Sequence, residues 1–250
     1  MTLCRETTFQ CKPSQRAVPI GGATRTREIP LTNTQAEGFA DQLRKATWTD
    51  HDAAEYTNYM QALLGGQISK DGYAEMVAQH YFAYVAIEEA GHALAADPVA
   101  GPFVIPELER LEALEHDLKV LYGAGWKDAI KPSKPTITYV ARINQIADWP
   151  GGFIAHHYTR YMGDLSGGQV IRKSAERAYG FSGDDGVGFY NFPKIPDYKA
   201  FKFEYRDKLN ALGLDEVESK RIIGETLLAY QLNTEVLADL GKRMSEFKVA

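Results

Sequence analysis

The stretch that decides the fold reads Tyr158-Thr159-Arg160-Tyr161-Met162-Gly163-Asp164-Leu165-Ser166-Gly167-Gly168. Apolar residues on both sides of it recur at helical spacing, which predicts one long helix. Its three glycines each cost such a helix about 1 kcal/mol relative to alanine. Gly163 and Gly167 lie four positions apart and therefore on one helix face. The simplest physical reason is that a flat object lies against bare backbone on that face.

Around this stretch the sequence predicts an all-α protein. Helices are expected at about residues 34–59, 69–94, 106–122, 136–147, 150–179, 197–211 and 215–244, and period-two alternation is scarce. Thr34 is expected to cap the first of these helices, with Glu37 as its capping-box partner. Because the sequence contains no internal repeat, we expect a single multi-helical domain over residues 35–250.

Composition and charge narrow the class of protein. With 250 residues, of which 44% are hydrophobic, the chain can bury one sizeable core. A formal net charge of -5 argues against a nucleic-acid partner. No run of 18 apolar residues occurs, so stable membrane insertion is not expected. Cys4 and Cys11 form no disulfide framework, which makes the cytoplasm the expected location.

Residues 1–34 differ from the rest of the chain. They are rich in threonine, proline and basic residues, which predicts a flexible tail. A transit peptide, with a plastid location, is the alternative for this segment.

The sequence contains one possible metal-binding motif. Glu89-Ala90-Gly91-His92 has the Glu-x-x-His spacing that ferritin-like di-iron bundles use. That fold needs the motif twice, and the sequence contains no second copy. We therefore interpret Glu89 and His92 as solvated or capping residues.

His51 is the histidine that we single out. Helical spacing turns it inward, where it is either a satisfied core residue or a ligand. Glu55 lies one helical turn further on, where its carboxylate can accept a hydrogen bond from the imidazole. A single imidazole on one helix and a bare surface on another are the two faces that a planar iron porphyrin requires.

The run from Ile154 to Gly168 closely resembles the signature of the haem oxygenases. The resemblance extends over roughly Ala40 to Gly241. Ala46 to His51 is similar to the family's proximal-histidine helix, whereas Phe201 to Arg206 and Tyr230 to Asn233 are similar to its propionate-binding and pocket-lining segments. It implies a haem oxygenase-like fold, with haem between a proximal helix and a kinked distal helix.

The resemblance also implies an activity. Haem b would be both cofactor and substrate, and dioxygen would open its ring at a meso carbon, with the α carbon expected, to give biliverdin, carbon monoxide and ferrous iron. A transient redox partner, either a ferredoxin or an NADPH-dependent flavoprotein reductase, would supply electrons to a protein expected to be a monomer. The alternatives are a non-catalytic haem carrier or sensor of the same fold, and a di-iron or purely structural helical protein.

Carried over residue by residue, the resemblance makes His51 the iron ligand. Asp164 would order the waters that deliver protons, and its alternative role is a surface salt bridge with Arg160. Gly163 and Gly167 would let the distal backbone come close to haem. The expected catalytic residues are Asp164, Arg160, Gly163, Gly167, Tyr84 and Asn233.

Lys202 and Arg206 lie four positions apart and would bind the haem propionates. The expected haem-binding residues are Arg44, Glu55, Tyr158, Thr159, Gly168, Lys202, Arg206 and Tyr230. Trp48 is a departure from the family, which frequently has lysine there, and it bears on which meso carbon is exposed. His156 and His157 are interpreted as structural. Tyr161 and Met162 are interpreted as core-facing residues.

Overall fold

The computed structural model describes residues 37–247, apart from the side chains of Asp52 and Glu55. The regular elements of this part are all helices, so the predicted all-α class is confirmed. The predicted tail, residues 1–34, lies outside the described residues, and so does the proposed cap Thr34.

The helices follow one another in a fixed order along the chain. They are α1 (Phe39–Glu55), α2 (Asn58–Leu64), α3 (Lys70–Ala93), the 3-10 turn η1 (Gly101–Phe103), α4 (Leu111–Tyr122), α5 (Trp126–Ala129), α6 (Lys134–Gln145), α7 (Pro150–His157), the π-helix η2 (Tyr158–Met162), α8 (Gly168–Tyr179), the 3-10 turn η3 (Gly188–Tyr190), α9 (Tyr198–Asn210), α10 (Glu216–Lys242) and α11 (Met244–Phe247).

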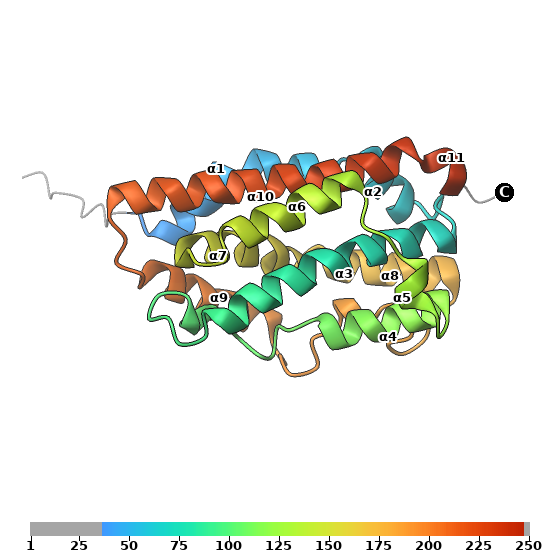
Figure 1. The fold of residues 1–250 in the computed structure, drawn as a ribbon, viewed down its shortest axis with the longest axis horizontal. Coiled ribbons are helices and arrows are strands. Elements are labelled where there is room, and N and C mark those ends of the chain that lie inside the picture. Colours follow the sequence, from blue (N-terminus) through green and yellow to red (C-terminus); the bar gives the residue numbers. More distant parts are fainter. Residues whose placement is uncertain (1–36, 248–250) are drawn as a thin grey trace, which may run out of the picture. The chain divides into compact units, whose positions relative to one another are not determined.

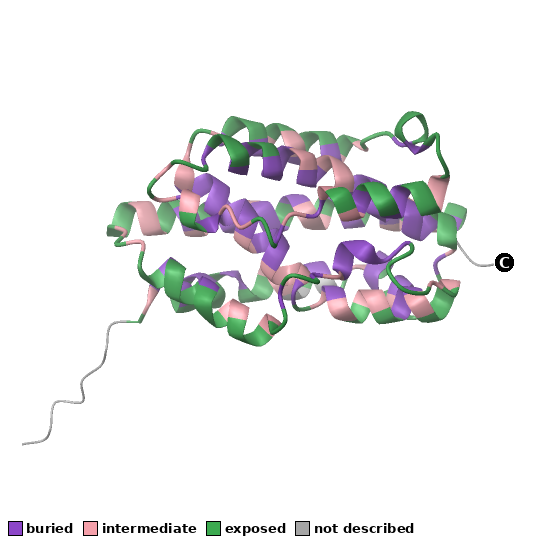
Figure 2. Ribbon diagram, turned by 90° about the horizontal axis from the view of Figure 1, so that it is seen from below, coloured by how far each residue is buried: buried purple, intermediate pink, exposed green. Residues whose placement is uncertain are grey.

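Two long helices organise the packing. α10 packs along α1, α6 and α7, and α3 packs against α4, α6 and α7 (Figure 1). Buried residues gather on the helix faces that are turned toward one another, and exposed residues lie on the outer faces (Figure 2). Seven tyrosines are among the largest fully buried side chains, namely Tyr59, Tyr73, Tyr84, Tyr139, Tyr161, Tyr190 and Tyr205. Within the described residues, no helix is both long enough and apolar enough to cross a membrane.

Side-chain caps confirm three of the predicted helix starts. Ser69 accepts a hydrogen bond from the Gly72 amide (3.2 Å), and Asp215 accepts one from the Glu218 amide (2.8 Å). Asp197 caps α9 in the same way. Each side chain satisfies a backbone donor that the first helical turn leaves without a partner. The helix expected from residue 136 begins slightly earlier, at Lys134, because Ser133 provides its cap.

The helix predicted at residues 34–59 is too long at its C-terminal end. α1 stops at Glu55, and Thr57 has an extended backbone with ψ of 145°. Its hydroxyl accepts a hydrogen bond from the Met60 amide, so Thr57 is the N-cap of a separate helix, α2. Tyr59, which was expected to end the first helix, therefore belongs to the second.

The helix predicted from Pro106 begins five residues later, at Leu111. The reason is a cap that comes from another helix. The carboxylate of Glu88 on α3 accepts hydrogen bonds from the amides of Arg110 (2.6 Å) and Leu111 (3.2 Å). A buried carboxylate at this point fixes where the helix starts, because it satisfies amides that a longer helix would have used internally.

The single helix predicted from Pro150 to Tyr179 is also wrong. The chain forms α7, widens into the π-helix η2, and then turns at residues 165–167 before α8 begins. In this turn the Ser166 amide donates to the Gly163 carbonyl (3.0 Å). π-helical turns often occur at functional sites, and this one comes directly before Gly163.

His156 and His157 are both buried between helices. His156 Nε2 lies 2.9 Å from Glu225 Oε1 on α10, and His157 Nδ1 lies 2.8 Å from the Tyr205 hydroxyl on α9. Each histidine therefore ties α7 to another helix. Burial, followed by the charge of Lys208, lowers the pKa of His157 to about 3.

This pKa predicts an acid-sensitive fold. The unfolded histidine has a pKa of about 6.5, so the unfolded state binds more protons between about pH 6.5 and 3. The free energy of unfolding should therefore fall as the pH is lowered through this window, by up to about 1.4 kcal/mol per pH unit for this one group.

We expect His157→Gln, which has no such proton to bind, to be less stable than the wild type at pH 7 and to approach it at pH 5. Urea denaturation at both pH values measures the difference. Two stability curves that run parallel between pH 7 and 5 would contradict the assignment.

Candidate functional site

A cleft lies between α1, α10 and the segment that runs from η2 into α8. It contains an inner cavity of about 130 Å³, which reaches Asp164 and Asn233, and a rim cavity of about 290 Å³, which reaches Lys202 and Arg206. Both volumes far exceed the room that one water molecule needs. Three residues, His51, Gly163 and Tyr230, line both cavities, so the two cavities adjoin each other in the same cleft.

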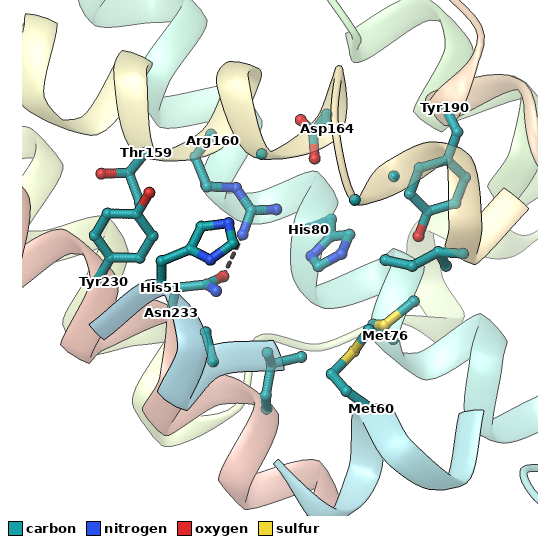
Figure 3. A pocket seen from close by; sticks show the side chains of 16 residues that line it. His51, Met60, Met76, His80, Thr159, Arg160, Asp164, Tyr190, Tyr230 and Asn233 are labelled. Atoms are coloured by element: carbon teal, nitrogen blue, oxygen red, sulfur yellow. Dashed lines mark hydrogen bonds between the residues drawn. The ribbon is translucent and has the colours of Figure 1, made fainter. Parts of the chain in front are cut away.

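His51 projects from α1 toward the helix that carries Thr159, Arg160 and Asp164 (Figure 3). Its ring is nearly parallel to the indole of Trp48, with centroids 5.9 Å apart and an interplanar angle of 12°. The Tyr230 ring meets it edge-on at 6.1 Å. The inward orientation expected from helical spacing is therefore present, and the imidazole faces a cavity rather than a closed core.

The opposite wall of the cleft is helix backbone. A Cβ atom added at Gly163 would meet no other atom within 4 Å, because the position opens into the cleft. Gly168 has a different reason to be glycine, since its Cβ would come within 2.9 Å of the buried Tyr190 ring. Gly167 also lines the inner cavity, but it lies in the turn and not on a continuous helix face.

Two hydrogen-bonded pairs of polar side chains lie at the inner cavity, Tyr84 with Asp164 and Arg160 with Asn233. The hydroxyl of Tyr84 donates a hydrogen bond to Oδ2 of Asp164. Arg160 donates to the amide oxygen of Asn233 on α10 (Figure 3). Its guanidinium lies 5.1 Å from the centre of the Tyr84 ring. Asp164 and Arg160 form no ion pair, although both are among the described residues. The predicted alternative role of Asp164, a salt bridge with Arg160, is thus not what the structure contains.

Asp164 has a carboxyl group that titrates near neutral pH. Enclosure by protein raises its pKa to about 6, although the charge of Arg160 and the hydrogen bond from Tyr84 act in the opposite direction. A carboxyl group with this pKa can hold a proton or release one at physiological pH.

The rim cavity is lined by cations. Arg44 on α1 and the pair Lys202 and Arg206 on α9 line it, together with Tyr158. Lys202 also donates a hydrogen bond to Ser166 Oγ (2.9 Å). Partial burial, followed by the charge of Arg206, lowers the pKa of Lys202. This arrangement suits carboxylates at the mouth of the cleft, because an anion there would relieve the repulsion between the two α9 cations.

The remaining residues that the sequence analysis singled out have different surroundings in the structure. Thr159 is buried and lines the inner cavity, where its hydroxyl donates to the Ala155 carbonyl. The side chain of Glu55 lies outside the described residues. Tyr161 is a buried core residue as expected, whereas Met162 is only half-buried and lines the rim cavity. Glu89 is exposed, and His92 lies 2.8 Å from Glu109, so the two residues do not act together.

Sequence reasoning missed several residues of the inner cavity. His80 on α3 is the most important, because it places a second imidazole in the same cavity as His51 (Figure 3). Burial lowers the pKa of His80 well below its usual value, which keeps it neutral. The other missed lining residues are Ala54, Met60, Met76, Ile171, Tyr190 and Leu237. The sequence places His80 three and four residues from the apolar Val77 and Met76, on the inward face of its helix, but such spacing cannot distinguish a cavity wall from the core.

Together these features describe a cleft for a flat, apolar, anionic ligand that binds a metal. An imidazole stands on one side, bare backbone on the other, apolar residues line the interior, and cations stand at the mouth. A haem group has these properties.

Comparisons with known proteins agree with this geometry. A family model described as "Heme oxygenase" matches residues 37–239. Over 203 residues the chain is 39% identical to the heme oxygenase of Rhodella violacea, a match that covers 81% of this chain and 86% of the relative. It is 35% identical over 222 residues to heme oxygenase 1 of Rattus norvegicus, covering 88% of this chain and 77% of that one.

Solved structures show the same likeness. The crystal structure of heme oxygenase-1 from Synechocystis sp. PCC6803 in complex with heme matches with a TM-score of 0.80 at 36% identity, and covers 84% of this chain and 95% of that chain. The heme oxygenase of Leptospira interrogans matches with a TM-score of 0.77 at 34% identity, covering 81% and 100%.

The two glycines on the wall of the cleft should respond oppositely to substitution. Gly163→Ala should raise the free energy of unfolding by up to about 1 kcal/mol, because alanine favours helix and its Cβ has open space. Gly168→Ala should lower it by about 1–3 kcal/mol, because its Cβ collides with Tyr190. Chemical denaturation of both variants measures these changes. Equal destabilisation by the two substitutions would show that the backbone at Gly163 is not open.

Proposed function

The chain belongs to the haem oxygenase family, and on this premise we propose that it cleaves haem at a meso carbon to biliverdin, carbon monoxide and ferrous iron, with dioxygen and external electrons. The observation that carries the proposal is that His51 faces a helix surface with no side chain at Gly163. Haem needs an axial ligand on one face and room for a small molecule on the other.

The described residues fit haem. The open position at Gly163 is a cradle that a side chain would fill, and the imidazole of His51 is a common axial ligand for haem iron. The rim cations Arg44, Lys202 and Arg206 would bind the two propionates, with Tyr158 as a hydrogen-bond donor. Bound haem supplies the iron that activates dioxygen and the ring carbon that is oxidised.

The bare backbone at Gly163 has two effects on the reaction. With no side chain in that part of the cleft, it would leave room for dioxygen, and the backbone itself would limit the directions that dioxygen can take there. Larger side chains at this position would occupy that space. By binding the propionates, the rim cations would set which meso carbon faces the wall, and we expect this to be the α carbon.

The role of Asp164 in this mechanism is proton transfer. Its carboxyl group lies on the inner cavity, receives a hydrogen bond from Tyr84, and has a pKa of about 6. It therefore exchanges protons with water near neutral pH and can hold ordered water beside the dioxygen site. Arg160 donates a hydrogen bond to Asn233, and both side chains line the inner cavity. They add further polar groups to which such water can bind.

A haem carrier or sensor of the same fold is less well supported. Such a protein needs the axial ligand and the rim cations, but it has no use for a carboxyl group tuned toward neutral pH on the open face of the cleft. Electrons must come from an external donor, because each turnover consumes reducing equivalents that the chain cannot replace by itself. We infer a transient complex between a monomer and either a ferredoxin or an NADPH-dependent flavoprotein reductase, at the positive rim.

The first test of the function separates the two histidines of the inner cavity. We expect the wild type to bind haem in a 1:1 ratio and, with oxygen and a reductant, to convert it to biliverdin with release of carbon monoxide. His51→Ala should lose the haem absorbance of a histidine-ligated complex, because the iron loses its ligand, whereas His80→Ala should keep it. Absorbance spectroscopy measures haem ligation and biliverdin formation, and gas analysis measures the release of carbon monoxide. A haem complex that survives unchanged in air with reductant would refute the enzyme, and loss of ligation in His80→Ala alone would move the ligand to α3.

The second test addresses Asp164. Asp164→Asn should bind haem about as well as the wild type but form biliverdin at least about tenfold more slowly, because the amide cannot exchange a proton. Tyr84→Phe is the matched control, since it removes the hydrogen bond but leaves the carboxylate, and its rate should lie between the two. Stopped-flow absorbance measures the rates. An Asp164→Asn rate equal to that of the wild type would exclude the carboxyl group from proton transfer.

A further inference from the structure

Trp48 is a large apolar side chain at the mouth of a charged cavity. Its surface is 55% exposed, although the chain buries most of its aromatic residues. It lies on α1 one turn after Arg44 and one turn before His51, and it lines the rim cavity with Lys202 and Arg206. Residues three positions apart on a helix are neighbours, and here the indole is stacked on the imidazole of His51.

Two rings hold the imidazole of His51 from different directions. The indole of Trp48 lies nearly parallel to it at 5.9 Å and 12°, and Tyr230 on α10 meets it at 6.1 Å and 68°. Both separations lie in the range of favourable aromatic contacts, one offset-stacked and one edge-to-face. Since the terminal torsion of histidine has broad minima, its ring plane rotates easily unless neighbours restrict it.

We propose that Trp48 is a positioning residue which, together with Tyr230, fixes the plane of the His51 imidazole beneath the haem. The inference rests on the proposed function, in which His51 is the iron ligand. The parallel indole restricts rotation of the imidazole on one side, and the edge-on Tyr230 ring restricts it on another. Together the two contacts favour one orientation of the ring plane.

The absence of charge on Trp48 supports the same role. Three rim cations, Arg44, Lys202 and Arg206, are available to carboxylates, so position 48 need not supply a fourth. An uncharged indole can stack on the imidazole instead. Its edge would remain available to a flat apolar ligand in the cleft, while its face stays on the imidazole.

The orientation of an axial imidazole can be measured apart from activity. Electron paramagnetic resonance of the ferric, cyanide-ligated haem complex reports it, because the imidazole plane determines which iron orbitals it overlaps and hence the spread of g values. The variants are Trp48→Phe, which keeps a ring to stack, and Trp48→Ala, which does not. Tyr56→Ala is the matched control, since Tyr56 is an exposed aromatic residue just beyond α1 that lines neither cavity.

We expect the wild type, Trp48→Phe and Tyr56→Ala to give one narrow set of g values, and Trp48→Ala to give a broadened or second set. Loss of the stack should also speed transfer of haem to apomyoglobin by about threefold to tenfold in Trp48→Ala. A Trp48→Ala spectrum and transfer rate equal to those of the wild type would overturn the inference, and so would equal changes in the alanine and phenylalanine variants. If the wild type itself gives no histidine-ligated spectrum, the proposed function fails instead.

Discussion

The cleft depends on one constraint, which is that the helix facing His51 carries no side chain at Gly163. A glycine-rich segment has a low helix propensity, and here the backbone does not continue as a regular α-helix. It widens into the π-helix η2 just before Gly163 and turns just after it, so the backbone is held by tertiary packing rather than by helix propensity. The same segment places Arg160 and Asp164 on the cavity. The backbone that shapes the wall therefore also positions its polar groups.

α3 supplies the support that keeps this wall in place. Its Tyr84 donates to Asp164, and its Glu88 accepts from the Tyr161 hydroxyl (3.2 Å) while it caps α4. The distal segment is thus tied to a long, well-packed helix at two neighbouring levels. Burial costs these groups solvation, which is visible in the raised pKa values of Glu88 and Asp164. Hydrogen bonds offset that cost, and what remains is a carboxyl group that can titrate beside the reaction site.

Local signals in the sequence were sufficient for much of the fold. Ser69, Asp197 and Asp215 mark helix starts because a cap acts on the three residues that follow it. The start of α4 was predicted wrongly because its cap, Glu88, lies on another helix. Helical spacing gave no sign of the break in the glycine-rich helix, since it cannot distinguish a π-helix from an α-helix, although the family resemblance implied a kinked distal helix.

The candidate site shows the same division. His51, Gly163 and Asp164 were predicted from spacing and from a long family signature. Lys202 and Arg206 were predicted from the same resemblance, and their separation of four residues places them on one helix face. His80 and Tyr190 were not predicted, because only folding brings α3 and η3 to the same cavity. Trp48 was identified as a departure from the family, but its stack on His51 required the structure.

A crystal structure of the protein with bound haem tests the central claim most directly. The account predicts iron at coordination distance from His51, about 2.0–2.1 Å as for other metal–imidazole bonds. It also predicts one haem face against the backbone of Gly163, and propionates that reach Lys202 and Arg206. Iron bound to His80, or haem seated away from Gly163, would contradict it.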